Sequence, residues 1–154
     1  MKVNKIRFTG FISTFLLISN TWANDLTGTW KTIDDKSGSA GANVLIYKNN
    51  DGTYAGKIEK IYDLPNGAKP KVGKCTVCKG ELKDKPIIGL RILSNFVENT
   101  QNKNEYIHGQ VVDSETGNTY KGKIKIHPNG KKITLRGYIG VSVLGRSQTW
   151  IKID

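Results

Sequence analysis

The fold of this chain is decided by the stretch Thr119-Tyr120-Lys121-Gly122-Lys123-Ile124-Lys125-Ile126-His127-Pro128-Asn129-Gly130. Lysine alternates with glycine or isoleucine along it, which is the two-residue period of a strand with one solvated face. Pro128-Asn129-Gly130 ends the pattern, and Asn-Gly favours the positive φ angles of a tight reversal. Another strand pattern begins at Lys132. The stretch therefore predicts a β-hairpin.

Similar short runs fill the rest of the chain, and helical periodicity is almost absent after residue 24. The candidate strands are Thr27–Ile33, Ala42–Lys48, Thr53–Tyr62, Ile87–Phe96, Glu105–Asp113, Thr119–His127, Lys132–Ile139 and Ser147–Ile153. Eight consecutive strands suit an all-β fold, a single antiparallel up-and-down β-barrel, because closure removes the edge strands. An open two-sheet sandwich is the alternative.

The predicted loops divide into two groups if the strands alternate in direction. One end of the barrel receives the loops 49–52, 97–104 and 128–131. The other end receives 34–41, 63–86, 113–118 and 140–146. Loops longer than about 12–15 residues often serve as lids or binding loops. The sequence therefore predicts a closed bottom and a loop-rich mouth.

The N-terminus has a different pattern. Three basic residues precede the largely apolar run 8–18, and a polar segment then ends at the small residue Ala23. This layout is typical of a secretory signal peptide over residues 1–23, with a retained membrane helix as the alternative. We expect one domain over 24–154 with no transmembrane anchor after cleavage, in the periplasm or secreted from the cell.

The chain beyond this segment is basic. Residues 24–154 contain 21 Lys and Arg against 13 Asp and Glu, a net charge of +8. Basic proteins often bind nucleic acid, but these lysines follow the solvated face of a strand without an arginine–aromatic cluster to stack bases. We expect no nucleic-acid partner, and an anionic envelope component as a further partner of the basic faces.

The first strand opens with Leu26-Thr27-Gly28-Thr29-Trp30, which resembles the opening of the calycin superfamily of lipocalins and fatty-acid-binding proteins. The resemblance implies that Trp30 plugs the closed end beneath a basic residue from the last strand. The first strand begins where the eighth ends, so Lys152 is the expected partner. A cation on an aromatic face stabilises by about 0.5–2 kcal/mol.

A closer resemblance covers nearly all of the chain after residue 27. Its motifs are Gly28-Thr29-Trp30, Asp51-Gly52-Thr53-Tyr54-Ala55-Gly56-Lys57-Ile58, Pro86-Ile87-Ile88-Gly89-Leu90, Gly117-Asn118-Thr119-Tyr120, Leu135-Arg136-Gly137-Tyr138 and Leu144-Gly145-Arg146-Ser147-Gln148-Thr149-Trp150. In this order they resemble the DUF2147 family, small exported bacterial proteins of undefined function. The resemblance implies a lipocalin-like barrel in the bacterial cell envelope or outside it. It implies no activity and no catalytic residues.

Cys75 and Cys78 lie in the long mouth loop. In an oxidising compartment an even cysteine count indicates a structural disulfide, worth about 2 kcal/mol for so small a ring. A redox pair would need a βαβ setting, haem attachment a histidine at Lys79, and zinc two further ligands. We expect a disulfide that pins the loop 63–86 near Arg146, no metal and no cofactor, with redox and zinc roles as alternatives.

The run 87–93 is apolar on both of its faces. It is either a strand covered on both sides or the wall of a ligand cavity, because an eight-stranded barrel is either filled or holds one small molecule. The candidate ligand-binding residues of the cavity and mouth are Tyr54, Ile58, Ile88, Leu90, Ile92, Tyr106, Tyr120 and Arg146.

Two polar side chains allow contrasting interpretations. His108 shares its parity with Tyr106, so we expect it to point inward, more often as a core histidine than as a ligand or base. Arg146 lies at the mouth, where it could bind a carboxylate or phosphate head group. The alternative for Arg146 is a loop arginine bonded to backbone carbonyls.

These patterns favour a binding protein over an enzyme. No nucleophile elbow or metalloprotease motif occurs in the sequence. The first hypothesis is therefore non-enzymatic binding of a small hydrophobic or amphipathic molecule through the mouth. The alternative is an envelope interaction protein whose filled barrel serves as a scaffold.

Overall fold

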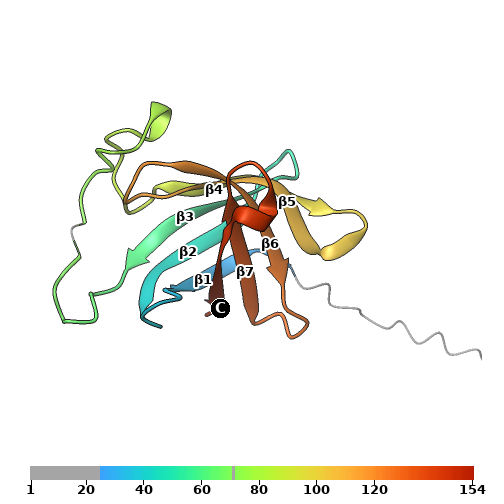
Figure 1. The fold of residues 1–154 in the computed structure, drawn as a ribbon, viewed down its shortest axis with the longest axis horizontal. Helices are drawn as coiled ribbons and strands as arrows, with labels where there is room; N and C mark the ends of the chain where they lie inside the picture. The colour runs from blue at the N-terminus through green and yellow to red at the C-terminus, as the bar shows by residue number, and fades with distance from the viewer. Residues whose placement is uncertain (1–24, 71) are drawn as a thin grey trace, which may run out of the picture.

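The strands of the computed structural model pair in sequence order, and the last strand returns to the first (Figure 1). The model describes residues 25–70 and 72–154, so the predicted signal peptide, residues 1–23, lies outside the described residues. Within the described ranges eight antiparallel strands form one closed barrel, which confirms the predicted barrel over the sandwich. Those ranges contain no helix long and apolar enough to cross a membrane.

The elements have the following bounds. The strands are β1 (Gly28–Ile33), β2 (Ala40–Lys48), β3 (Tyr54–Ile61), β4 (Arg91–Asn99), β5 (Asn102–Val112), β6 (Thr119–Ile126), β7 (Lys132–Tyr138) and β8 (Arg146–Lys152). Two one-turn 3-10 helices, η1 (Gly80–Leu82) and η2 (Ser142–Leu144), lie in loops of the mouth end.

The tight turns lie where the sequence predicts them. Gly52 and Gly130 adopt φ angles of 85° and 67°. Their amides donate to the carbonyls of Asn49 and His127 at 3.0 and 2.9 Å. A positive φ angle costs glycine little, so the Asp-Gly and Asn-Gly pairs set the register of their hairpins.

The predicted strand 87–96 is wrong at both ends. Gly89 has a φ angle of 88°, and the Leu90 amide donates to the Ile87 carbonyl at 3.1 Å, so this segment is a turn. β4 therefore begins at Arg91. It continues to Asn99 and pairs there with Asn102, which replaces most of the predicted loop 97–104 with a short hairpin connection.

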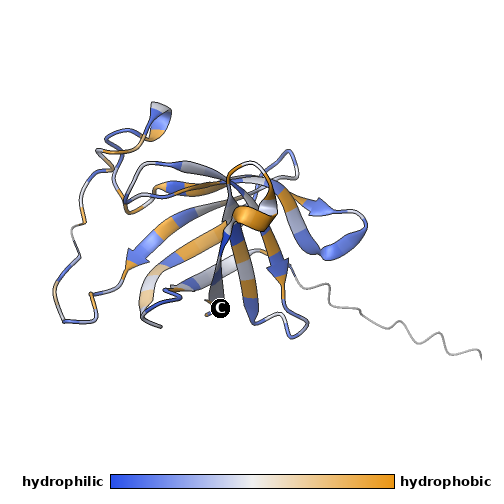
Figure 2. Ribbon diagram, in the orientation of Figure 1, coloured by the Kyte–Doolittle hydropathy of each residue, from blue (hydrophilic) through white to orange (hydrophobic). Residues whose placement is uncertain are grey.

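Hydrophobic and hydrophilic residues alternate along the strands (Figure 2). The buried hydrophobic residues form one core inside the barrel. Its buried members are Leu26, Trp30, Val44, Ile46, Tyr54, Leu93, Phe96, Tyr106, Ile124, Ile126, Ile133, Leu135 and Trp150. Glycine makes room for the Phe96 ring in the middle of the barrel. A Cβ atom at Gly109 would lie 2.3 Å from the Phe96 ring, and one at Gly122 would lie 2.8 Å from it.

A second, smaller core lies under the long loop of the mouth end. Cys75, Cys78 and Leu90 are buried there, and the partly buried Ile87, Leu82 and Val112 pack on them. Ile92 packs against both cores, because the register of β3 and β4 shifts between the pairs Gly56–Leu93 and Lys57–Arg91. The long loop thus has a folding unit of its own, attached to one side of the barrel.

Candidate functional site: the mouth of the barrel

The closed end of the barrel is sealed by the predicted tryptophan. Trp30 is fully buried, and its indole N–H donates to the Leu26 carbonyl at 2.9 Å. The ammonium of Lys152 lies 5.3 Å from the Trp30 ring centroid and donates to the Thr27 carbonyl at 3.0 Å. This confirms the predicted cation–π pair.

The side chain of Asp154 also contributes to the contacts at the closed end. Asp154 accepts a hydrogen bond from the Thr29 amide, and this bond holds the pKa of Asp154 below its ordinary value. The Trp30 indole, the Lys152 ammonium and the Asp154 carboxylate each have a hydrogen-bond partner, so we interpret the closed end as a plug rather than as a binding site.

Two of the predicted cavity residues belong to the filled core. The rings of Tyr54 and Tyr106 meet edge to face with centroids 4.9 Å apart. Both side chains are buried, and burial raises the pKa of Tyr106 far above its ordinary range. These tyrosines therefore lie in the packed interior rather than beside open space.

The inward positions nearer the mouth are less filled. Tyr120 pairs with Val111, Gly137 pairs with Gly122, and Gln148 on β8 pairs with Leu135. These four residues share the inward face because Ile124, Leu135 and Trp150 on the same strands are buried in the core. All four are only partly buried. Ile58, also on the inward face, is buried.

The prediction that Ile88, Leu90 and Ile92 lie on one face of a single strand and form a cavity wall is wrong. The turn at Gly89 puts Ile88 outside the barrel, where it is 42% exposed, and sends Leu90 into the core of the long loop. Ile88 and Leu90 instead line an open outer groove of about 670 Å³. Of the three residues, Ile92 alone contacts the barrel core.

Arg146 lies at the mouth as predicted, but its partners are carboxylates. Its guanidinium donates to both oxygens of Asp35 and lies 4.0 Å from Asp34. The hydrogen bond from Arg146 lowers the pKa of Asp35, whereas hydrogen bonds from Ser37 chiefly lower that of Asp34. A ligand head group would therefore compete with Asp35 for this cation.

Arg136 on β7 makes the contacts with loop carbonyls that were the alternative for Arg146. Its guanidinium donates to the carbonyls of Ser142 and Val143 at 2.6 and 2.9 Å, and to the Ser147 hydroxyl at 2.9 Å. These bonds hold η2 against β7. No sequence motif marks these partners of Arg136, because they depend on the path of the loop that brings the carbonyls to it.

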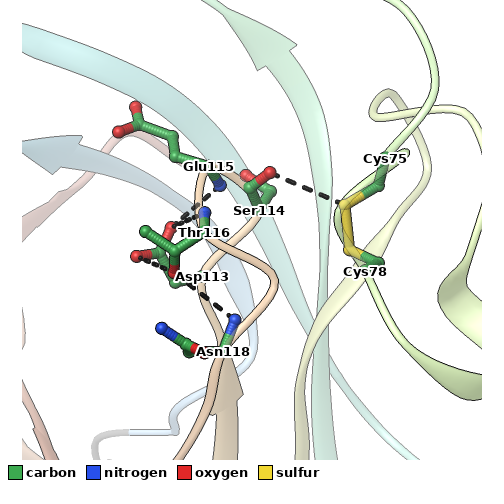
Figure 3. The surroundings of a disulfide bond; sticks show 7 residues. All are labelled: Cys75, Cys78, Asp113, Ser114, Glu115, Thr116 and Asn118. Carbon is green, nitrogen blue, oxygen red and sulfur yellow. Dashed lines mark hydrogen bonds between the residues drawn. A yellow bond between two sulfur atoms is a disulfide. The ribbon is translucent and has the colours of Figure 1, made fainter.

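Cys75 and Cys78 form the predicted disulfide (Figure 3). The disulfide contacts the β5–β6 turn, where Cys75 Sγ lies 3.6 Å from the Ser114 carbonyl oxygen. Gly117 of that turn approaches so closely that an added Cβ atom would lie 1.9 Å from the Val77 carbonyl oxygen. The loop therefore packs on the β5–β6 turn. Arg146, which we expected to lie near the loop, contacts Asp34 and Asp35.

His108 is exposed, so its predicted inward position is wrong. Its φ angle is 61°, and the β5–β6 register shifts between Tyr106 and Gly109. The resulting bulge places Gly109 on the inward face in its stead. Within residues 25–70 and 72–154, no group of three or more His, Cys, Asp or Glu side chains is arranged to hold a metal ion.

Comparison with known proteins decides the family. A family model described as "Uncharacterized protein conserved in bacteria (DUF2147)" matches residues 28–152, from the start of β1 to the end of β8. The chain belongs to the DUF2147 family. No curated protein matches it.

A solved structure resembles the barrel of this DUF2147 protein. It is HP1028 from the human pathogen Helicobacter pylori, a protein described as belonging to the lipocalin family. The two share 19% sequence identity over 84% of each chain, with a TM-score of 0.69. At this identity the likeness shows the fold, a lipocalin-like barrel.

Proposed function

We propose that this DUF2147 protein is a non-enzymatic binding protein that takes a small apolar or amphipathic molecule at the mouth of its barrel. The observation that carries the proposal is the contrast along the interior. The closed half is filled by large buried side chains, whereas Val111, Tyr120, Gly137 and Gln148 remain partly exposed at the mouth. A mostly apolar recess with a few polar groups is the usual form of a small-molecule site.

The polar groups of the mouth support binding rather than catalysis. Arg146 is engaged with Asp34 and Asp35, and Arg136 is engaged with loop carbonyls. In this proposal the apolar part of the ligand contacts Ile58 and Val111, while its polar end meets Tyr120, Gln148 or the rim cation Arg146. An anionic head group would take the place of Asp35 at the Arg146 guanidinium.

We further propose that the protein is exported and acts in the periplasm or outside the cell. The N-terminal pattern of residues 1–23 supports cleavage before Asn24. The Cys75–Cys78 disulfide also fits an oxidising compartment. The intact mass of the protein recovered from its host tests this, since a mass that includes residues 1–23 would contradict cleavage.

The binding test uses fluorescent fatty-acid probes and native mass spectrometry of protein purified from its host. Gln148→Trp should block the mouth and weaken probe binding at least tenfold, because position 148 faces inward. Thr149→Trp adds the same side chain on the exposed outer face of the same strand and should leave binding unchanged.

Two results would overturn the proposal. Absence of both probe binding and a co-purifying ligand would favour the alternative, an interaction protein built on a filled barrel. Equal binding by Gln148→Trp and the wild type would place any ligand elsewhere.

A further inference from the structure

The positive charge of this protein is concentrated in its last three strands. Residues 116–153 contain eight Lys or Arg residues and no Asp or Glu, whereas residues 24–115 contain 13 basic and 12 acidic residues. The lysines of β6 point outward, because the alternate residues Gly122, Ile124 and Ile126 are buried. Lys131 and Lys132 add two exposed cations at the β6–β7 turn. Of the two basic residues of β8, Lys152 lies over the Trp30 ring and Arg146 pairs with Asp35, so we call the outer surface of β6 and β7 the cationic face.

An apolar loop lies on this same face. Arg136 stands beside Lys123 across the β6–β7 pair, so its side chain also points outward. From there it bonds the carbonyls of Ser142 and Val143 and folds residues 139–145 back over β7. Figure 2 shows η2 as a hydrophobic segment in front of the strands.

The apolar side chains of this loop are turned toward solvent. Val143 and Leu144 are 82% and 79% exposed, and Ile139 and Val141 are also exposed. The Arg136 bonds hold the backbone carbonyls against the barrel, which leaves the side chains outermost. Clustered exposed aliphatic side chains with a polar surround mark an interaction surface.

We propose that the apolar loop and the cationic face together dock this protein onto a lipid bilayer that contains anionic phospholipids. Aliphatic side chains enter the boundary between head groups and acyl chains, and the lysines beside them meet the lipid phosphates. Charge complementarity favours this partner over a second copy, because pairing two cationic faces would bring like charges together. The proposal does not depend on ligand binding, although the docked loop belongs to the mouth end.

Binding to lipid vesicles tests the proposal, with the protein purified from its own host. The wild type should bind vesicles of phosphatidylcholine with phosphatidylglycerol at least tenfold more tightly than vesicles of phosphatidylcholine alone. V143S/L144S should lower binding to the anionic vesicles at least tenfold. K121Q/K125Q should lower it several-fold, and added salt should reduce the difference from the wild type.

The matched control is K79Q/K83Q, which removes the same charge from exposed positions of the long loop. It should change vesicle binding less than twofold. Equal losses in K79Q/K83Q and K121Q/K125Q would overturn the proposal, as would absence of wild-type binding to anionic vesicles. Light scattering that shows a dimer, dissociated by V143S/L144S, would assign the surface to a second copy and likewise overturn it.

Discussion

The two ends of the barrel are held together by different kinds of contact. At the closed end, Trp30 fills the interior and is satisfied by Leu26 and Lys152. At the mouth, loops are held by contacts outside the barrel core, namely the Cys75–Cys78 disulfide and the bonds of Arg136. We therefore expect the stability of the barrel to reside mainly in the closed half, and a binding site at the mouth to cost the fold little.

The largest expected effect comes from emptying the closed end. Trp30→Ala should lower the free energy of unfolding by about 3–5 kcal/mol, because it removes a fully buried aromatic side chain. Tyr120→Ala, at the partly exposed mouth, should cost clearly less. Urea unfolding of both variants measures the difference, and equal losses would contradict the division between the two ends.

A smaller effect is expected from one added methyl group. Gly109→Ala should destabilise by about 1–3 kcal/mol, because its Cβ atom would overlap the Phe96 ring. Gly137→Ala is the matched change at the mouth. There the added Cβ atom would lie 3.7 Å from Tyr120 Cβ, which is an ordinary van der Waals contact. It should be nearly neutral in the same unfolding assay. A neutral Gly109→Ala would show that the middle of the barrel has spare room.

Loss of the disulfide should loosen the mouth and spare the barrel. Cys75→Ser with Cys78→Ser should cost about 2 kcal/mol by the chain-entropy argument. Hydrogen exchange should rise in residues 63–86 and in the β5–β6 turn that contacts the disulfide. Collapse of protection in every strand would show instead that the disulfide belongs to the barrel core.

The smallest effect concerns the rim carboxylates. The hydrogen bond from Arg146 lowers the pKa of Asp35 below its ordinary 3.8. The stabilisation from this pair is therefore present above the ordinary pKa and is lost as the pH falls through the lowered value. Carbon-detected NMR titration should show the pKa of Asp35 rising in Arg146→Gln. Asp51 at the closed end, whose pKa is lowered by Thr53, should not change; a parallel rise there would contradict a local effect.

Regular alternation and turn chemistry made the barrel predictable from sequence. The β6–β7 hairpin follows from local spacing, whereas the Trp30–Lys152 pair was implied by the resemblance to the calycin opening together with strand direction. The structure departs from the prediction where one residue has an unusual backbone angle. Gly89 turns residues 87–90, the first part of the apolar run, out of the barrel strand, and His108 forms a bulge in β5.

Contacts between distant loops could not be read from the sequence. The pairing of Arg146 with Asp35 joins residues 111 positions apart, and the disulfide is seated on a turn almost 40 residues further along. Such contacts depend on loop paths, which have no periodicity to reveal them. The sequence therefore pointed to the mouth end and to Ile58, Tyr120 and Arg146, but it did not indicate Val111, Gly137 or Gln148.

The most direct test of ligand binding at the mouth is to locate the residues of the barrel that a bound amphipathic probe contacts. Methyl-labelled NMR spectra recorded during titration with a fatty acid distinguish Ile58 and Val111 at the mouth from Ile126 and Ile133 in the filled core. If the ligand binds at the mouth, the probe should shift and contact the methyl groups of Ile58 and Val111 and leave those of Ile126 and Ile133 unchanged. Contacts at Ile126 and Ile133, or no change at any of these methyl groups, would contradict it.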